Sequence, residues 1–467
     1  MKFNKEAFLV VGLSKSGISA SKLLLSRGAE VFLYDQSDSP RVASAESELA
    51  SLGAIRIDKE KVDETLQKVC ALIVSPGVPI DHPVALRANE LKKRVLGELE
   101  LGSLFLKAPM VAVTGTNGKT TTVSMIEFVL KNAGVSASAL GNVGVPLSSA
   151  AETFPKNGIA VVEVSSFQLE TVHSFTPHVG VLLNLTEDHL NRHYNMKIYA
   201  HLKQKLFQNM RESEFSVLND SCSLSHEIAK KTKSRVVWFS SERQVEGAYV
   251  LGNDIFYMGA RLFSVQDLAL KQKHNVENAL ATIAVCKLLG VETEVIRRSL
   301  AKFRGAKHRL ELICSQNGIN FVNDSKATNP DASLSAVQCM KKPTILLLGG
   351  QDKGYSYRSL LKSLKNSVVR YCIFYGENRE TLMREAVQEN FTTYSIVENL
   401  QQAVHIAQTV AKSGETVLLS PASASFDEFD GYEQRGNAFV RYITEGKANG
   451  RNKKTRDVNR KGDEGKK

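Results

Sequence analysis

The sequence has few cysteines and no long apolar run, and these absences exclude several classes of protein. Its six cysteines are scattered over 467 residues without a Cys-x-x-Cys pair. Most of them lie in apolar runs, so we expect small core side chains in a reducing cytoplasm. No apolar run approaches the roughly 20 residues that span a bilayer, and the N-terminal residues enter a strand–glycine pattern without a secretory segment. We therefore expect a cytoplasmic protein without membrane insertion.

The chain also lacks internal repeats, and it lacks low-complexity segments before its last residues. Hydrophobic residues make up 43% and charged residues 23%, as in soluble globular proteins. A chain of 467 residues is too long for one core and suits about three domains.

The net charge of +11 comes largely from residues 447–467, which hold nine Lys/Arg and three Asp/Glu. This basic tail has no apolar periodicity, so we predict that it is disordered. A nucleic-acid-binding arm is the alternative, but no aromatic residue is present there to stack on bases. We expect no nucleic-acid partner.

The segment VTGTNGKTT, which begins at Val113, predicts a nucleotide loop. An apolar run precedes it and a stretch with helical spacing follows, so backbone N–H groups and a helix N-terminus face whatever the loop binds. Gly115, Thr116, Asn117 and Gly118 form the predicted loop, which Lys119, Thr120 and Thr121 follow. The lysine suits β/γ-phosphate oxygens and the Thr120 hydroxyl suits Mg²⁺. Val113 replaces the first glycine of the usual phosphate loop, so we predict a variant loop that binds ATP.

A second glycine turn, residues 12–17, follows the first predicted strand, and Asp35 ends the second. Ser14 replaces the middle glycine of a dinucleotide-binding turn, which keeps the backbone away from a pyrophosphate. We therefore favour another nucleotide-linked ligand over NAD. Ser75 and Gly77 end a later strand and are expected on the same face.

Strands and helices alternate along most of the chain, which predicts an α/β fold with parallel sheets. Ala7–Val11 and Ala71–Val74 are expected to be strands, and residues 196–210 a helix. Hairpins are expected over residues 249–265, with a turn at Gly252-Asn253, and after residue 308. We predict a Rossmann-like N-terminal domain (1–97), a central P-loop-type ATPase domain (98–305) and a Rossmann-like C-terminal domain (306–446), followed by the tail.

Two polar clusters follow strands beyond the nucleotide loop. The first contains Glu163, and the second, NLTEDHLNRH, contains Asp188, His189 and His193. Carboxylate and imidazole beyond a nucleotide loop suit hydrated Mg²⁺ that bridges phosphates. The two histidines are four residues apart, as zinc ligands on a helix can be, but no HExxH context supports zinc. Helix caps or polar turns are the alternative interpretation of each cluster.

Eight segments occur in the order typical of one family. They are VTGTNGKTT, GNVG, EVSSFQLE, NLTEDHLNRH, HNVENALA, HRLE, DSKATN and LLSPASASFDEFDGYEQRG. In this order they resemble the Mur ligase family, over roughly residues 5–445. The resemblance implies an ATP- and Mg²⁺-dependent amide ligase, and its last two segments favour D-glutamate as the amino acid added to UDP-N-acetylmuramoyl-L-alanine. A related ligase for another amino acid, such as a folate-glutamylating enzyme, and a non-enzymatic nucleotide-binding module are the alternatives.

The resemblance also implies roles for single residues. Lys119, Glu163, His189 and Lys203 would be catalytic, and Thr120, Glu163, His189 and a carbamylated Lys203 would hold two Mg²⁺ ions. Asn275, Asn278, Arg309 and Asp324 would join the loop in binding ATP. Ser14, Lys15, Ser16, Asp35, Ser75, Gly77, Asn142, Ser165 and Gln168 would bind the UDP-sugar. His189, Lys326, Thr328, Lys353, Ser425, Phe426 and Tyr432 would bind D-glutamate.

Lys203 and Asn191 need separate treatment, the first for its position and the second for its residue type. Bare sequence places Lys203 on a helix surface, and only the resemblance implies that it is carbamylated. Asn191 stands where many members of the family have Asp, which argues against a charged role at that position. We expect a monomer.

Overall fold

A computed structural model describes Phe3 and residues 6–444, except 143, 189, 306 and 353. The side chains of residues 190, 191 and 331 are likewise outside the description. Contacts divide the chain into two compact units, Met1–Phe303 and Arg304–Lys467. In the part of the chain that is described, no helix is both long and apolar enough to cross a membrane.

The first sheet of unit 1 has the strand order β3-β2-β1-β4-β5, all parallel. Its strands are β1 (Ala7–Val11), β2 (Glu30–Tyr34), β3 (Ile55–Arg56), β4 (Ala71–Val74) and β5 (Arg94–Gly97). Its helices are α1 (Lys15–Ser26), α2 (Pro40–Ser51), α3 (Val62–Lys68), α4 (Pro83–Glu90) and α5 (Glu98–Phe105). Separate apolar clusters cover the two faces, with α1, α2 and α5 on one and α3 and α4 on the other. This is the predicted Rossmann-like arrangement, and it brings the ends of β1, β2 and β4 together.

The second sheet of unit 1 has the order β14-β13-β12-β11-β10-β9-β6-β8-β7. Its strands are β6 (Met110–Thr114), β7 (Ala137–Gly141), β8 (Ile159–Glu163), β9 (Val179–Leu182), β10 (Phe215–Asn219), β11 (Arg235–Ser240), β12 (Gly247–Leu251), β13 (Asp254–Tyr257) and β14 (Ala260–Ser264). Those from β6 to β12 pair in parallel. The central strands β6 and β9 are buried along their whole length, and β8 is buried except at Ile159, which explains their unbroken apolar runs.

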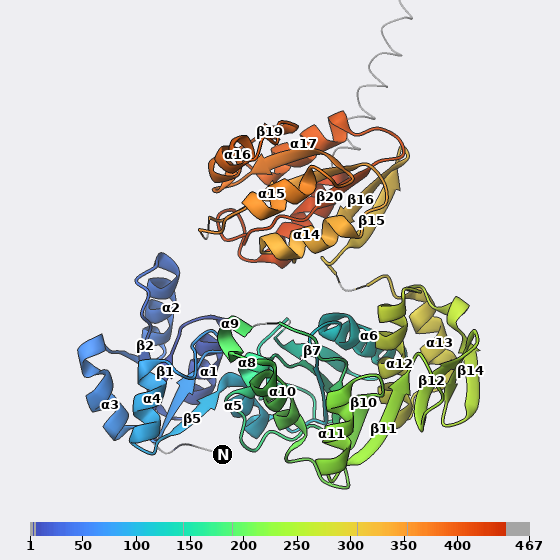
Figure 1. Cartoon of the computed structure of the whole chain (residues 1–467). Coiled ribbons are helices and arrows are strands. Elements are labelled where there is room, and N and C mark those ends of the chain that lie inside the picture. The colour runs from blue at the N-terminus through green and yellow to red at the C-terminus, as the bar shows by residue number, and fades with distance from the viewer. Residues whose placement is uncertain are drawn as a thin grey trace, which may run out of the picture. The chain divides into compact units, whose positions relative to one another are not determined.

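Helices cover both faces of this sheet (Figure 1). They are α6 (Lys119–Asn132), α7 (Leu147–Ala150), α8 (Ser166–Leu169), α9 (Leu190–His193), α10 (Met196–Gln204), α11 (Ser223–Lys231), α12 (Lys273–Leu288) and α13 (Thr293–Lys302). One apolar cluster joins α6, α12 and α13 to the sheet, and another joins the opposite face to α5, α7 and α11. The predicted helix over residues 196–210 is shorter than expected, since α10 continues only as a 3-10 turn to Phe207.

The predicted hairpin over residues 249–265 is present as β12 and β13, but the prediction missed a third strand. The chain forms three antiparallel strands, β12, β13 and β14. Two turns separate them, and Met258 and Gly259 in the second turn have φ of 47° and 82°. Only the first of these turns, Gly252-Asn253, is predicted from the sequence.

Unit 2 has one sheet with the order β15-β16-β20-β17-β18-β19. Its strands are β15 (Glu311–Gln316), β16 (Ile319–Asn323), β17 (Thr344–Gly349), β18 (Val369–Tyr375), β19 (Tyr394–Ile396) and β20 (Thr416–Leu419). Its helices are α14 (Pro330–Gln338), α15 (Arg358–Leu364), α16 (Arg379–Gln388), α17 (Leu400–Val410) and a last helix that is described to residue 444. β15 and β16 form the expected hairpin, and the remaining pairs are parallel. The α/β class is therefore confirmed in both units.

The expectation of core cysteines is only partly correct. Cys222, Cys286 and Cys372 are buried, whereas Cys70 and Cys339 are exposed and Cys314 is half-buried. All six are free thiols.

Candidate active site

The nucleotide loop connects β6 to α6. Gly118 has φ of 86°, and a Cβ atom there would lie 2.4 Å from Asn278 Oδ1 of α12. The side chain of Lys119 folds back and donates to the carbonyls of Gly115 and Thr116, both at 2.8 Å. A close-fitting glycine and a lysine over a helix N-terminus are the components of a phosphate site.

Glu163 lies beside this loop at the end of β8, because β6 and β8 pair with Val113 opposite Glu163. Its carboxylate is buried and accepts from Thr120 Oγ1 at 2.7 Å and from Asn142 Nδ2 at 2.7 Å. The structure therefore groups three predicted residues, from α6, from β8 and from the loop that follows β7. A buried carboxylate next to a hydroxyl, at a phosphate loop, is a donor set that fits Mg²⁺.

Lys203 of α10 is fully buried, with 1% of its surface exposed. Its Nζ donates to the Gly115 carbonyl at 2.9 Å and lies 4.5 Å from the Tyr199 ring centroid. Burial, reinforced by the positive charge of Lys119, holds the pKa of Lys203 well below its usual range. The helix-surface position that bare sequence predicts for Lys203 is wrong.

The nucleotide loop also forms hydrogen bonds with the segment that follows β9. Thr116 N donates to the Asn184 carbonyl at 3.1 Å, and Asn117 N donates to Asn184 Oδ1 at 2.8 Å. The Thr116 hydroxyl lies 3.2 Å from the Tyr199 hydroxyl. The two hydrogen bonds to Asn184 attach the loop to the NLTEDHLNRH segment. Of the two predicted adenine-site residues on α12, Asn278 is buried against Gly118 and Asn275 is half-buried.

The predicted UDP-sugar residues of the first sheet gather at the ends of its strands. Asp35 accepts from Leu13 N at 2.6 Å and from Ser37 N at 2.9 Å. The Ser75 hydroxyl donates to the Gly12 carbonyl at 2.6 Å, and Ser14 Oγ donates to Ser75 Oγ at 3.3 Å. Lys15 and Gly77 are exposed beside them, and Ser16 is half-buried.

Ser165 and Gln168 hydrogen-bond to each other. They form a capping box at the start of α8, in which Gln168 Oε1 accepts from Ser165 N at 3.0 Å. This is the cap that the sequence analysis named as the alternative interpretation for such clusters.

His193 is buried rather than arranged as a zinc ligand. Its Nε2 lies 2.9 Å from Ser166 Oγ, and its ring stacks on Tyr199 with centroids 5.3 Å apart. Among the described residues, no group of three or more His, Cys, Asp or Glu side chains could hold a metal ion. His189 lies outside the described residues, so its predicted metal and substrate roles stay predictions.

In unit 2, Asp324 follows β16 and is buried. Its carboxylate accepts from Ser420 Oγ at 2.7 Å and from Leu310 N at 3.1 Å. Burial raises the pKa of Asp324 to about 6, against the opposing effects of Ser420, Leu310 and Arg309. The short HRLE segment thus packs against the start of DSKATN.

Three loops of unit 2 meet at the ends of β16, β20 and β17, which are neighbours in the sheet. Buried Arg435 joins two of them, donating from Nε to Ser325 Oγ at 2.9 Å and from Nη1 to the Ala424 carbonyl at 3.0 Å. Gln351 N donates to the same Ala424 carbonyl at 2.9 Å and so adds the third loop.

The described residues of unit 2 that are predicted to bind D-glutamate lie on the loops after β16 and β20 and on the last helix. Ser425 is buried, Thr328 is half-buried and Phe426 is exposed. The Nζ of Lys326 lies 5.7 Å from the ring centroid of Tyr432. Lys353 lies outside the described residues. Arg435 is not among the residues predicted from the sequence, although its place in YEQRG, within a helix rich in apolar residues, could have suggested a buried cation.

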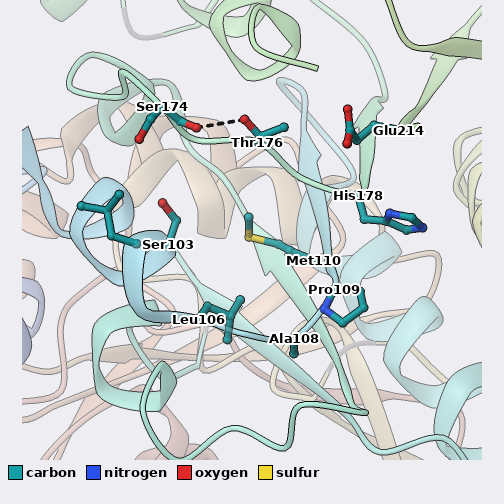
Figure 2. Close-up of a pocket in the computed structure, with 10 residues that line it drawn as sticks. Ser103, Leu106, Ala108, Pro109, Met110, Ser174, Thr176, His178 and Glu214 are labelled. Carbon is teal, nitrogen blue, oxygen red and sulfur yellow. Dashed lines mark hydrogen bonds between the residues drawn. The ribbon is translucent and has the colours of Figure 1, made fainter. Parts of the chain in front are cut away.

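A separate cavity of about 270 Å³ lies at the opposite end of β6, where the strand begins (Figure 2). Its lining includes Met110, Thr176, His178 and Glu214. Because parallel α/β sheets bind ligands at the carboxyl ends of their strands, this cavity is on the wrong edge for the nucleotide.

Comparisons with known proteins agree with this geometry. Residues 6–97 match the profile described as Mur ligase MurD-like, N-terminal domain. Residues 113–286 match the Mur ligase middle domain, and residues 308–423 match the Mur ligase glutamate ligase domain. The chain belongs to the Mur ligase family.

Among its relatives are proteins named UDP-N-acetylmuramoylalanine–D-glutamate ligase. The one from Caldanaerobacter subterraneus subsp. tengcongensis is 37% identical, over 95% of this chain and 99% of its own length. Its counterpart in Thermoanaerobacter sp. is 38% identical, over 95% and 99%. The fold is similar to that of UDP-N-acetylmuramate–alanine ligase from Thermotoga maritima, with a TM-score of 0.57, 20% identity and coverage of 95% and 99%.

Proposed function

We propose that this chain is an ATP-dependent ligase that joins D-glutamate to UDP-N-acetylmuramoyl-L-alanine in peptidoglycan precursor synthesis. The observation that carries the proposal is the group of Lys119, Thr120, Glu163 and buried Lys203 around one glycine loop. It occurs in a chain that aligns over 95% of its length with ligases of that name. We also propose that the enzyme acts in the cytoplasm as a monomer.

The first step makes an acyl phosphate. A carboxylate oxygen of the L-alanyl group attacks the γ-phosphorus of ATP, and the bond to the β-phosphate oxygen breaks to release ADP. Both reactants are anions, so charge neutralisation dominates the barrier. Lys119 exchanges the carbonyls of Gly115 and Thr116 for β/γ-phosphate oxygens, while the loop N–H groups and the start of α6 bind the phosphates.

The Mg²⁺ ions that the family resemblance implies would be held by Thr120 and Glu163, and by His189 with a carbamylated Lys203. Bound there, Mg²⁺ would screen the negative charge of the triphosphate and of the attacking carboxylate. Carbamylation adds a neutral amine to CO₂ and releases a proton. The burial that lowers the pKa of Lys203 favours that neutral amine. Asn142 and Thr120 hold the Glu163 carboxylate in place by hydrogen bonds.

The second step forms the amide. The amine of D-glutamate attacks the acyl carbon, and inorganic phosphate leaves from the tetrahedral intermediate. We assign D-glutamate to Lys326, Thr328, Lys353, Ser425, Phe426 and Tyr432, because two lysines and hydroxyls suit a dicarboxylate. Arg309, Asp324, Asn275 and Asn278 are assigned to ATP on the family resemblance.

Trapping tests the proposed acyl phosphate. The enzyme is incubated with ATP, Mg²⁺, UDP-N-acetylmuramoyl-L-alanine and hydroxylamine, without D-glutamate, and the sugar nucleotide is analysed by mass spectrometry. A hydroxamate of the L-alanyl carboxyl is expected, together with ADP. ADP release with no hydroxamate, in an enzyme that turns over normally with D-glutamate, would contradict the proposed intermediate.

A further inference from the structure

Arg192 of α9 connects the nucleotide-binding half of unit 1 to the first sheet. Its guanidinium donates from Nη2 to the carbonyls of Val78 at 3.0 Å and Pro76 at 3.4 Å, and from Nη1 to that of Gly77 at 3.5 Å. One planar side chain thus holds three successive carbonyls of the turn that follows β4. Only arginine carries enough donors in a fixed geometry for this.

The guanidinium of Arg192 also pairs with a buried carboxylate. Glu170 accepts from Arg192 Nε at 3.0 Å and from Nη2 at 2.6 Å, and its side chain is 5% exposed. The guanidinium also lies 5.0 Å from the centroid of the Phe167 ring. These contacts fix the orientation of Arg192, so that its remaining donors face the turn.

The turn that Arg192 holds shapes the predicted UDP-sugar site. Ser75, at its first position, donates to the Gly12 carbonyl at 2.6 Å and accepts from Ser14. A Cβ atom on Gly12 would lie 2.8 Å from Val78 Cγ2, so the glycine turn packs directly on the residue whose carbonyl Arg192 binds. A displacement of residues 76–78 would therefore move the loop of residues 12–14.

The residues next to Arg192 strengthen this connection. His193 stacks on Tyr199, whose hydroxyl contacts Thr116 of the nucleotide loop. The Tyr194 hydroxyl donates to Asp81, beyond the turn. Residues 192–194 therefore contact both the turn after β4 and the wall of the nucleotide site.

We infer that Arg192 is a positioning residue for the sugar nucleotide: it holds the turn 76–78, and through it the loop 12–14, in the shape that binds the UDP-sugar. The inference rests on the proposed function. It concerns the affinity for one substrate, and Arg192 need not touch that substrate.

Steady-state kinetics of Arg192→Lys test the inference. Lysine keeps the charge opposite Glu170 but cannot reach three carbonyls. We expect the KM for UDP-N-acetylmuramoyl-L-alanine to rise about tenfold, with kcat and the KM values for ATP and D-glutamate nearly unchanged. Calorimetric titration with the sugar nucleotide alone should show the same loss of affinity. Arg243→Lys is the matched control, because Arg243 pairs with Asp220 in the same two-donor geometry on the protein surface.

A second variant keeps the inference testable if Arg192→Lys does not fold. Arg192→Gln combined with Glu170→Gln leaves no unpaired buried charge, and it should show the same selective rise in KM with a thermal midpoint close to that of the wild type. An unchanged KM for the sugar nucleotide, or an equal rise in all three KM values, would overturn the inference. An inactive wild-type enzyme would instead contradict the proposed function, and the calorimetric arm would still test Arg192.

Discussion

At the scale of single residues, the site depends on the burial of groups that normally carry charge. Lys203 and Lys119 both lie at the Gly115 carbonyl, where Lys203 Nζ donates at 2.9 Å and Lys119 Nζ at 2.8 Å. Two ammonium groups so close repel each other, and the buried one is more costly to charge. We therefore propose Lys203 as the amine that is carbamylated and Lys119 as the lysine that binds phosphate.

Replacing Lys203 tests the carbamate. Lys203→Ala and Lys203→Arg should both lower turnover at least about a hundredfold, about 2.7 kcal/mol in the barrier, because neither side chain supplies a carbamate oxygen. Small carboxylic acids should partly restore Lys203→Ala. Phosphate release measures turnover, and circular dichroism checks the fold.

Lys197→Ala is the matched control, since Lys197 is an exposed residue of the same helix, α10. It should have normal turnover. Near-normal activity of Lys203→Arg would show that a fixed positive charge suffices, and the carbamate would be rejected.

Asp324 gives a prediction for pH. Its pKa is raised from 3.8 to about 6 in the folded protein, so the folded state binds more protons than the unfolded state between these values. The contribution of Asp324 to the free energy of unfolding is therefore full below about pH 4. It is lost as the pH rises through about 6, and the loss is at most about 3 kcal/mol. Asp324→Asn stays neutral throughout. We expect the thermal midpoint of the wild type, minus that of Asp324→Asn, to fall from pH 4 to pH 6, whereas a constant difference would contradict the raised pKa.

At the scale of elements, the unit formed by β6, the glycine loop and α6 positions the chemistry. β6 is buried along its whole length, and α12 covers the loop through Asn278. Two features require glycine at position 118. Its φ of 86° is unfavourable for other residues, and Asn278 fills the space of a Cβ atom.

Two glycine substitutions separate these effects. Gly118→Ala should lower kcat/KM for ATP at least about tenfold, since the loop must move away from Asn278. Gly134 follows α6 with φ of 78° but has no atom within 4 Å of its Cβ position. Gly134→Ala should therefore cost about 1 kcal/mol in stability and leave ATP kinetics unchanged. Equal kinetic effects of the two substitutions would refute the steric role of Asn278.

Much of the fold could be predicted from the sequence because parallel strands are short apolar runs with clear ends. Ala7–Val11 and Ala71–Val74 were predicted with the bounds that the structure shows. The third strand of the antiparallel extension was missed because Met258, a residue that rarely has positive φ, begins its turn. Turns of this kind are set by packing rather than by local sequence.

The site was predictable where short-range sequence patterns determine it. The glycine loop and its lysine follow from spacing, and the order of the motifs gave Glu163. The burial of Lys203 could not be derived from α10 alone, because it depends on the loop from β6 that lies over it. Arg192 was missed for the same reason, since its partners are backbone carbonyls more than 100 residues away in the sequence.

At the scale of the whole molecule, the two units carry different predicted ligands. Unit 1 holds the ATP loop and the residues predicted to bind the UDP-sugar, and unit 2 holds most of those predicted to bind D-glutamate. Each group lies at the carboxyl ends of parallel strands, where backbone N–H groups and helix N-termini favour anions. All three substrates are anionic, which fits this arrangement.

Deletion of residues 446–467 tests the prediction for the basic tail. None of the assigned site residues lies there, and its composition cannot form a core. The truncated enzyme should keep its turnover and its thermal midpoint. A loss of activity beyond about tenfold, about 1.4 kcal/mol, would show that the tail has a function.

The most direct test of the proposed function is phosphate release with ATP, Mg²⁺, UDP-N-acetylmuramoyl-L-alanine and a panel of amino acids. The proposed function predicts release that requires all components and strongly prefers D-glutamate over L-glutamate and meso-diaminopimelate. Omission of Mg²⁺ by chelation should abolish it. Equal turnover with meso-diaminopimelate, or none with D-glutamate, would contradict the assignment of this chain to D-glutamate ligation.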